Sequence, residues 1–320
     1  MKNIAILTSG GDAPGMNTAV RAAAKYAFSK GLKVFGVRRG YAGMYKDEIF
    51  EMTQKDVSGI IDRGGTTLLT ARLPEFKNPE IRAVAAANLK KKGIEGLVVI
   101  GGDGSYHGAD LLYKEHGIKV VGLPGTIDND IAGTDYTIGF DTTLNTILDA
   151  ISKLRDTATS HERTYIIEVM GRHAGDLAVY SCLAGGGDGL LIPEKGYDIN
   201  ELANMINKRR ENGKLHDIIL VAEGVGSATD IAKELEGKVK SEMRVTILGH
   251  IQRGGAPSAF DRIISTKMGA YAVEKLLEGE SGIMVGIESN KVVTHPIAYA
   301  WEHKKTIDAK DYELALILSE

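Results

Sequence analysis

The feature that most constrains the fold is a recurring unit, in which a short run of Val, Ile and Leu leads into glycines and then into a helical pattern. Such continuous apolar runs are typical of strands buried on both faces, and their alternation with helices predicts a parallel α/β sheet. Ligands of such sheets bind at the carboxyl ends of the strands, where the glycine-rich loops fall. The runs span residues 3–7, 97–100, 120–123, 166–169 and 218–222.

Helical patterns follow the apolar runs, and further strand patterns indicate a second sheet. Apolar residues recur at helical spacing over residues 141–160, and Asp141 is the expected N-cap of this helix. A short helix is expected near residues 109–114. Further strand and helix patterns over residues 163–223 predict a second sheet.

Composition and charge exclude several classes of protein. Lys and Arg number 39 and Asp and Glu 42, a net charge of −3, so no global basic field recruits nucleic acid or an anionic membrane. The single Cys182 cannot form an intramolecular disulfide. The N-terminus reaches glycine before a signal peptide is complete, and no apolar run approaches the ~18 residues of a membrane span, so we expect a cytoplasmic protein. Glycine is unusually frequent, at 39 of 320 residues, about 12% against a typical ~7%.

Two glycine-rich loops are candidate phosphate sites. Gly10 and Gly11 follow the first run, and residues 101–105 follow the second, each ahead of a helical pattern. Backbone N–H groups in such loops can bind phosphate oxygens, and Asp103 is a carboxylate able to reach Mg²⁺. Neither loop matches the P-loop or the Rossmann fingerprint, since His107 replaces the third glycine of the latter. A tight turn without a ligand remains the alternative for each loop.

The loop over residues 124–130 holds two carboxylates, Asp128 and Asp130, after the third run. A calcium loop is excluded, because Ala132 and Gly139 stand at positions that need ligands. Two interpretations remain open from the residues alone. One is a solvated Asx turn, and the other is a general base placed at the end of a strand to take a proton from a hydroxyl.

Five arginines lie in or near glycine-rich or strand-edge segments. Each alone is typical of a surface salt bridge, but a group of guanidinium donors indicates a site for several phosphate groups. Combined with the loops, this pattern predicts phosphoryl transfer between a nucleotide and a phosphorylated small molecule. The five are Arg72, Arg163, Arg172, Arg244 and Arg253.

The motifs GGDGS, PGTIDND, MGRHAGD, VAEGVG and LGHIQRGG occur in this order, and with them the chain resembles the bacterial ATP-dependent 6-phosphofructokinases nearly end to end. The resemblance implies an α/β fold of two three-layer α/β/α domains with mostly parallel sheets, and an active site in the cleft between them. The larger, ATP-binding domain would comprise residues 1–139 and about 251–305, and the smaller, sugar-phosphate-binding domain about 140–250 and 306–320.

The resemblance also implies the reaction and the partners. ATP with Mg²⁺ would phosphorylate the 1-hydroxyl of fructose 6-phosphate, a step of glycolysis. The enzyme would be a cytoplasmic homotetramer that ADP or phosphoenolpyruvate regulates, with no nucleic acid or membrane partner.

Roles of single residues follow from the same resemblance. Asp128 would be the general base, with Thr126 and Asp130 orienting the substrate and the phosphates beside it. Negative charge on the transferring group would be stabilised by Gly11, Arg72 and Arg172. ATP would be bound by Gly11, Arg72, Leu73, Gly102, Asp103, Gly104 and Ser105, with Asp103 as the ligand of Mg²⁺. The sugar phosphate would be bound by Thr126, Ile127, Asp128, Arg163, Met170, Gly171, Arg172, Glu223, Arg244, His250, Ile251, Gln252 and Arg253, with Arg163 and Arg244 coming from a neighbouring subunit.

Two positions bear on the phosphoryl donor. Pyrophosphate-dependent relatives carry Asp at position 104 and Lys at position 125, whereas this chain has Gly104 and Gly125. A carboxylate at position 104 would repel the α-phosphate of ATP, so the two glycines favour ATP.

At the effector site, which would bind ADP or phosphoenolpyruvate, this chain departs from the family pattern. Arg21 and Lys25 are like charges one helical turn apart, which either an anionic ligand or a solvated helix face explains. Asn212 and Leu215 stand where the family commonly has Arg and Lys, and Gly59 replaces an Asp, so we expect a weakened response. The full set is Arg21, Lys25, Arg155, Gly186, Gly187, Asp188, Asn212, Lys214, Leu215 and His216.

Two other functions require different motifs. A nucleotide sensor without activity would need a damaged catalytic loop, and PGTIDND is intact. Lipid and NAD kinases have a similar GGDG-type loop but lack the TIDND and HxQRGG segments, and a coupled assay with fructose 6-phosphate separates them.

Overall fold

The computed structural model describes residues 1–319, and the chain forms two compact units. The first unit comprises Met1–Ile127, Ile131–Thr142 and Arg253–Lys305. The second comprises Asp128–Asp130, Thr143–Gln252 and the chain from Thr306 onward. Among the described residues, no helix combines the length and the apolar character that a membrane crossing requires.

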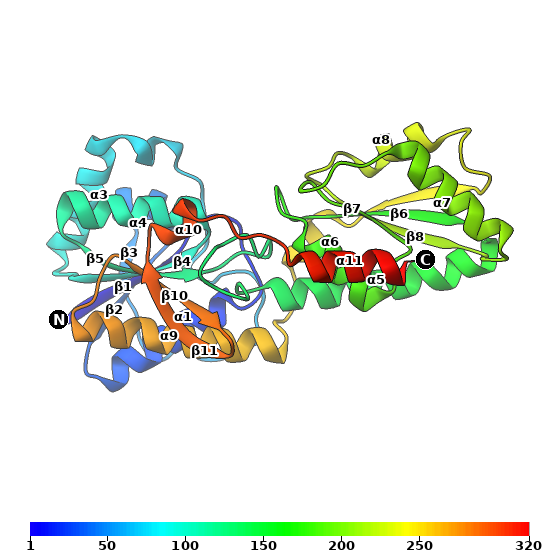
Figure 1. The fold of residues 1–320 in the computed structure, drawn as a ribbon. Coiled ribbons are helices and arrows are strands. Elements are labelled where there is room, and N and C mark those ends of the chain that lie inside the picture. The colour runs from blue at the N-terminus through cyan, green and yellow to red at the C-terminus, as the bar shows by residue number, and fades with distance from the viewer. Residues whose placement is uncertain (320) are drawn as a thin grey trace. The chain divides into compact units, whose positions relative to one another are not determined.

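The first unit is built on a seven-stranded sheet. Its strands are β1 (Asn3–Thr8), β2 (Lys33–Val37), β3 (Ile49–Glu51), β4 (Gly96–Gly101), β5 (Lys119–Pro124), β10 (Ile283–Glu288) and β11 (Lys291–Pro296). They stand in the order β11-β10-β5-β4-β1-β2-β3 (Figure 1). The strands from β10 to β2 pair in parallel, and the edge strands β11 and β3 pair antiparallel to their neighbours. The first three predicted strands are thereby confirmed as β1, β4 and β5.

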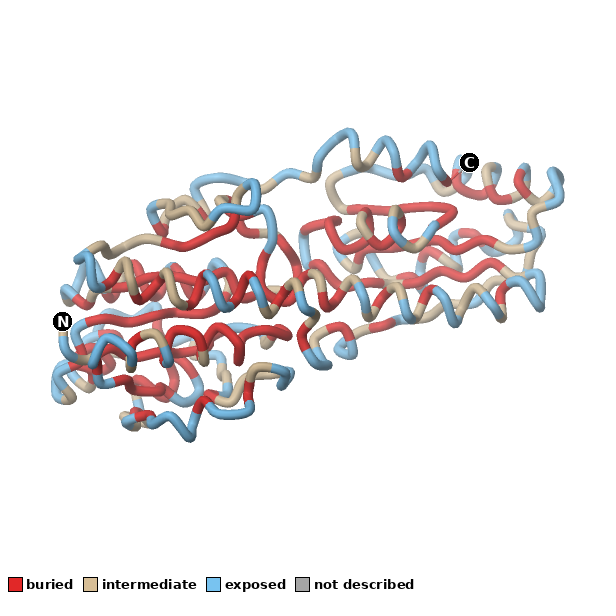
Figure 2. Tube along the Cα trace, turned by 90° about the horizontal axis from the view of Figure 1, so that it is seen from below, coloured by how far each residue is buried: buried red, intermediate tan, exposed pale blue. Residues whose placement is uncertain are grey.

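Helices cover both faces of this sheet, because its central strands are apolar on both sides. The residues from Leu97 to Ile100 in β4 have no exposed surface, and Figure 2 shows the buried segments in the interior of each unit. The helices are α1 (Met16–Ser29), α2 (Gly40–Tyr45), α3 (Pro79–Lys91), α4 (Asp103–His116), α9 (Ala259–Glu278) and α10 (Tyr299–Glu302), with a 3-10 helix η1 (Pro74–Lys77). Figure 1 shows α1 and α9 on one face and α3 and α4 on the other.

The second unit has a smaller sheet of parallel strands. Its strands are β6 (Thr164–Val169), β7 (Gly189–Leu191), β8 (Asp217–Ala222) and β9 (Met243–Ile247), in the order β7-β8-β6-β9. Its helices are α5 (Phe140–His161), which begins in the first unit, α6 (Asp176–Gly185), α7 (Ile199–Glu211), α8 (Ala228–Leu235), α11 (Ala309–Leu318) and the 3-10 helix η2 (Gly249–Arg253). Apolar side chains of α7 and α8 pack on one face of β6 and β8. The predicted α/β fold with two mostly parallel sheets is confirmed.

Helix α4 begins earlier than the sequence pattern indicates, at Asp103 instead of near residue 109. Gly102 before it has extended backbone angles, and its carbonyl accepts hydrogen bonds from the N–H groups of Ser105 and Tyr106, which closes the first helical turn. Asp103 therefore lies in the first turn of a helix and not in a loop.

The prediction of Asp141 as a helix N-cap is wrong. Helix α5 begins at Phe140, which places Asp141 in its first turn, where its carboxylate accepts a hydrogen bond from the hydroxyl of Ser258. N–H groups at this helix end donate to the carboxylate of Asp261 in α9. Because this partner is far along the chain, the local sequence does not reveal the cap.

Candidate active site

The loops after β1 and β4 lie side by side, because these two strands are parallel neighbours. The N–H of Ser9 donates to the carbonyl oxygen of Ile100 at 2.9 Å. Gly101 has no room for a side chain, since a Cβ there would lie 2.5 Å from the carbonyl oxygen of Ser9 and 2.6 Å from Oγ of Ser105. The two glycine-rich loops of the sequence thus converge at one edge of the sheet.

The start of helix α4 supplies further N–H groups at this edge. Its N-cap is Gly102, and Asp103 and Gly104 in its first turn are exposed. N–H groups at a helix start attract anions through hydrogen bonds and through the helix dipole. This end of α4 can therefore bind phosphate, with the carboxylate of Asp103 next to it.

The two glycines that bear on the phosphoryl donor have different surroundings. A Cβ at Gly104 would meet no atom of the described residues within 4 Å. A Cβ at Gly125 would lie 2.9 Å from Cε of Met16 and 3.0 Å from Cγ2 of Ile100. A lysine at position 125 would have to displace these buried atoms, whereas a carboxylate at position 104 would fit.

The loop with the candidate base follows β5 and is bonded to the segment that precedes α5. The N–H of Ile138 donates to the carbonyl oxygen of Pro124 at 2.8 Å, and Oγ1 of Thr137 donates to that of Thr126 at 2.6 Å. Asp128 is only 5% exposed. This burial argues against a solvated Asx turn, and the role of Asp128 as a general base stays a prediction.

The neighbours of Asp128 are also held in place. Asn129 has a left-handed backbone conformation, and its amide donates to Oδ1 of Asp176 in α6 at 3.1 Å. Asp130 is half-buried, and Ile127 is buried within the first unit at 3% exposure. Each part of the loop is therefore held within its own unit.

Two of the candidate arginines belong to the first unit. The guanidinium of Arg253 lies against Gly11, because a Cβ at Gly11 would be 3.3 Å from Nη1 of Arg253. Arg72 is exposed and directly precedes Leu73, which packs against the apolar core of the unit. Arg253 thus places a positive charge beside the first glycine loop.

In the second unit, the segments after β6 and β8 meet. The N–H of Arg172 donates to Oε1 of Glu223 at 2.9 Å, and the N–H of Met170 donates to Oε1 of the fully buried Gln252 at 3.1 Å. Gly171 between them has a φ of 134°, and a Cβ there would lie 2.4 Å from a carbonyl oxygen. Residues predicted to bind the sugar phosphate are thus brought together from three separate segments.

Arg163 and Arg244 lie apart from this group, at the amino ends of β6 and β9. Both contact Glu242: Nε of Arg163 lies 2.6 Å from Oε2, and Arg244 forms a second ion pair. The hydrogen bond from Arg163 lowers the pKa of Glu242. Within one chain, these two arginines do not join the loops at the opposite ends of the strands.

Two further residues predicted to bind the sugar phosphate, His250 and Ile251, are exposed in η2.

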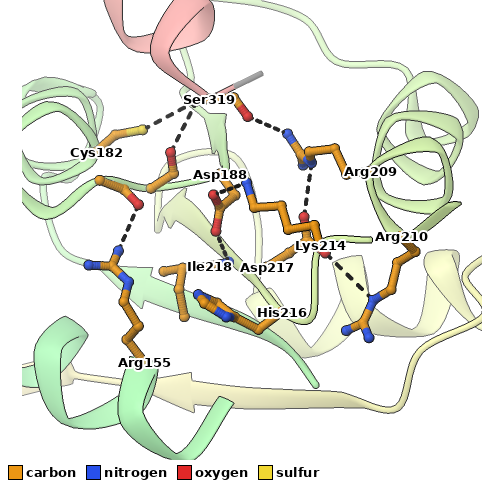
Figure 3. A network of polar contacts seen from close by, with 12 residues as sticks. Arg155, Cys182, Asp188, Arg209, Arg210, Lys214, His216, Asp217, Ile218 and Ser319 are labelled. Atoms are coloured by element: carbon orange, nitrogen blue, oxygen red, sulfur yellow. Dashed lines mark hydrogen bonds and ion pairs between the residues drawn. The ribbon is translucent and has the colours of Figure 1, made fainter. Parts of the chain in front are cut away.

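Several residues of the expected effector site form a polar network in the second unit, which Figure 3 shows. Nζ of Lys214 lies 2.5 Å from Oδ1 of Asp188, whose other oxygen accepts a backbone N–H at 2.8 Å. Arg155 donates to the carbonyl oxygens of Gly185 and Gly186 at 2.5 and 2.7 Å. The two cations therefore already have partners within the chain.

The remaining effector candidates have few contacts with this network. Nδ1 of His216 lies 3.1 Å from Oγ1 of Thr159, and burial lowers the pKa of His216. Asn212 follows the last residue of α7, and Leu215 is 48% exposed. The others are Gly187, after α6, and Arg21 and Lys25, on α1 in the first unit.

A buried ion pair in the same region has no counterpart among the sequence predictions. Asp217 is 0% exposed, and its Oδ1 lies 2.9 Å from Nε of Arg209, which also donates to the carbonyl oxygen of Ser319 at 2.7 Å. Burial raises the pKa of Asp217. No local pattern marks this pair, since basic residues are common in the last turn of solvated helices.

Comparisons with known proteins agree on one family. The family described as phosphofructokinase matches residues 3–276. The ATP-dependent 6-phosphofructokinase of Fusobacterium nucleatum subsp. nucleatum is 66% identical over 321 residues, which cover 100% of this chain and 99% of the relative. The ATP-dependent 6-phosphofructokinase of Bacillus subtilis (strain 168) is 57% identical over 319 residues, which cover 100% of both.

The similarity extends to a solved structure. The crystal structure of Pichia pastoris phosphofructokinase in the T-state matches with a TM-score of 0.90 at 39% identity. The match covers 99% of this chain and 37% of that chain, so this chain spans little more than a third of it. Sequence and fold agree over nearly the whole length, and the chain belongs to the phosphofructokinase family.

Proposed function

We propose that this chain transfers the γ-phosphoryl group of ATP to the 1-hydroxyl of fructose 6-phosphate, giving fructose 1,6-bisphosphate and ADP, as a step of glycolysis in the cytoplasm. The observation that carries the proposal is the buried carboxylate of Asp128, which follows β5, the neighbour of β4 and of the helix start that can bind phosphate. Relatives at 66% and 57% identity carry the name ATP-dependent 6-phosphofructokinase, which supports this donor and acceptor.

In this proposal, Asp128 takes the proton of the sugar hydroxyl as the hydroxyl oxygen attacks the γ-phosphorus. Thr126 and Asp130 orient the substrate and the phosphates. Phosphoryl transfer requires little covalent chemistry from the protein, so positioning and electrostatic stabilisation supply most of the rate. The stabilising groups are the amide of Gly11 and the guanidinium groups of Arg72 and Arg172.

The residues present fit a magnesium ion that arrives with the nucleotide. Mg²⁺ is usually held by one or two carboxylates together with substrate phosphates. Asp103 offers an exposed carboxylate in the first turn of α4, beside the N–H groups proposed to bind those phosphates. Bound there, Mg²⁺ neutralises part of the charge that develops on the phosphates.

Arg163 and Arg244 have a separate role in the proposal. They lie at the amino ends of β6 and β9, and Glu242 holds both guanidinium groups there. We assign them to the 6-phosphate of a neighbouring subunit, which makes the active enzyme a homo-oligomer, and in this family a tetramer.

A coupled assay tests the reaction. The purified chain is supplied with Mg·ATP and fructose 6-phosphate, and both ADP and fructose 1,6-bisphosphate are measured. Parallel reactions replace the sugar phosphate by NAD or by diacylglycerol, the acceptors of the kinases that share a GGDG-type loop. Turnover with either of these and none with fructose 6-phosphate would overturn the proposal.

Subunit mixing tests the shared site. Arg163→Ala and Asp128→Ser should each be nearly inactive alone, because each variant lacks one part of every site. Hybrid oligomers should regain activity, since some sites then combine an intact base from one subunit with an intact arginine from the other. Hybrids that form but stay inactive would show that Arg163 does not act across subunits.

A further inference from the structure

Another buried carboxylate, Asp261 in α9, lies outside the residues assigned above. It is 0% exposed and accepts hydrogen bonds from the N–H of Gly139 at 2.9 Å, from the N–H of Thr142 at 2.8 Å and from the hydroxyl of Thr142 at 2.5 Å. Gly139 and Thr142 flank the first residues of α5, so Asp261 caps this helix from another helix. Burying a carboxylate is costly, and these bonds offset the cost.

The capping is reciprocal between α5 and α9. Ser258, the N-cap of α9, donates its hydroxyl to the carboxylate of Asp141 at 2.5 Å, and its N–H donates to the hydroxyl of Thr142 at 2.9 Å. Side chains of each helix start thus bond the other helix start. The start of α5 is therefore fixed relative to the start of α9 within the first unit.

Gly139 links this junction to the two candidate catalytic loops. Its φ is 105°, and a Cβ there would lie 2.7 Å from Cβ of Ala13, 3.2 Å from Cδ of Pro14 and 3.3 Å from Cγ2 of Ile127. Ala13 and Pro14 belong to the loop after β1, and Ile127 directly precedes Asp128. A shift of Gly139 would therefore move both loops.

Asp261 also lies close to the end of the first of these loops. Gly15, the N-cap of α1, has a φ of 108°, and a Cβ there would lie 3.6 Å from Cβ of Asp261 and 2.9 Å from Cγ2 of Ile138. Ile138 is the residue whose N–H bonds the loop after β5. The starts of α1, α5 and α9 thus lie close together around Asp261.

We propose that Asp261 is a positioning residue for phosphoryl transfer: it holds the start of α5 so that Gly139 sets the spacing between the loop after β1 and the loop that carries Asp128. The inference rests on the proposed function. Burial raises the pKa of Asp261 to about 6, so the group is ionised at neutral pH and accepts all three hydrogen bonds. An amide at this position would turn one acceptor oxygen into a donor that faces an N–H or O–H group.

Asp261→Asn tests the proposal by separating kcat from KM. We expect kcat to fall about tenfold or more, because small displacements of reacting groups slow the chemical step strongly. The KM for fructose 6-phosphate should change less than about threefold, since most residues proposed to bind the sugar phosphate lie in the second unit. A folded variant that keeps kcat within about twofold of the native value would overturn the proposal.

Glu115→Gln is the matched control. It removes the charge of another carboxylate in the same unit, which accepts hydrogen bonds from the buried Arg82 at 2.6 and 2.7 Å. We expect a lower melting temperature with kcat unchanged. If Glu115→Gln loses as much kcat as Asp261→Asn, a general loss of stability explains both and the proposal fails.

Thr142 provides a second test if Asp261→Asn does not fold. Thr142→Val removes the hydroxyl that donates to Asp261, and Thr142→Ser retains it. We expect kcat about three- to tenfold lower in the valine variant and nearly native in the serine variant. Equal kcat in the two variants would overturn the proposal, whereas a native chain that is inactive in the same assay would overturn the proposed function instead.

Discussion

The loops around the candidate base and the polar network of the second unit are held in place in different ways. In the loops, close packing requires glycine: a Cβ at Gly101 would lie 2.5 Å from a carbonyl oxygen, and one at Gly125 would lie 2.9 Å from a side chain. In the network, ionised groups bind one another, as Lys214 binds Asp188. Backbone packing leaves N–H groups ready for a ligand, whereas a charge with a partner must lose that partner before it binds one. The proposed catalytic loops are therefore preorganised, and the proposed effector site is partly neutralised by its own chain.

The largest effect is expected at the preorganised loop. Asp128→Ser should lower kcat by roughly 10²–10⁴, the usual contribution of a positioned general base. Binding of fructose 6-phosphate should change little, because the arginines are proposed to supply it. Steady-state kinetics gives both quantities, with Asp110→Ser as the control, since Asp110 is a buried carboxylate of α4 paired to Lys114. Near-normal turnover of Asp128→Ser would show that another group is the base.

The next largest effect is expected in the polar network. Arg209→Leu leaves Asp217 buried without its closest cation, so the variant should lose about 3 kcal/mol of stability. Thermal unfolding measures this loss. Arg209→Leu combined with Asp217→Leu should recover much of it, because no uncompensated charge then remains. A double variant as unstable as the single one would show that packing of the Arg209 stem dominates.

The same pair predicts a dependence on pH. Burial raises the pKa of Asp217 above its unfolded value, and loss of Arg209 should raise it further. A raised carboxyl pKa means that the folded state binds the proton more tightly, so the contribution to stability is greatest in acid and is lost as pH rises from ~3.9 to the raised value. The melting temperatures of native protein and Arg209→Leu should therefore lie closer together in acid than at neutral pH. The exposed pair of Lys240 and Glu211 gives the control, because an exposed ion pair contributes little and Lys240→Leu should show only a small change with pH.

A smaller effect is expected at Gly104, one of the two glycines that bear on the choice of phosphoryl donor. Gly104→Asp should fold normally, because the space around Gly104 is open, and should lower kcat/KM for ATP about tenfold or more through like-charge repulsion that solvent partly screens. Gly125→Ala should instead reduce stability, since its Cβ would crowd Met16 and Ile100. Kinetics with ATP and thermal unfolding distinguish the two. Unchanged use of ATP by Gly104→Asp would mean that Gly104 only shapes the helix start.

The sequence predicts the central strands, because continuous apolar runs report burial on both faces and all five runs are strands, but it does not identify β2, β3, β7, β9, β10 and β11. It places α4 too late, since the glycines in the first turns of that helix hide the helical period. It cannot reveal Asp261 or the pair of Arg209 and Asp217, because these contacts join segments distant in sequence. Family motifs identify the candidate site residues, whose roles stay predictions until the variants are measured.

The smallest effect is expected at the proposed effector site. Asn212→Arg with Leu215→Lys adds two cations beside Lys214, whose own charge Asp188 already neutralises. A charge-assisted hydrogen bond to a phosphate contributes roughly 1.5–3 kcal/mol, so even one new contact should tighten phosphoenolpyruvate binding about tenfold. An effector shifts a conformational equilibrium only by its differential affinity, so inhibition should strengthen by no more than phosphoenolpyruvate binding does. Titration of activity with phosphoenolpyruvate measures the change.

The control for this restoration adds the same two charges elsewhere. Val84 and Leu277 are exposed apolar residues of the first unit, on α3 and α9, so Val84→Arg with Leu277→Lys changes the net charge equally without touching the network. Stronger inhibition in this control as well would assign the effect to the overall electrostatic field. Two results contradict the weakened-site hypothesis itself. One is strong inhibition of the native enzyme at micromolar phosphoenolpyruvate, and the other is a restored variant that responds as the native chain does. In either case, the ion pair of Lys214 with Asp188 would not limit effector binding, and the contrast between a preorganised site and a self-neutralised one would not hold.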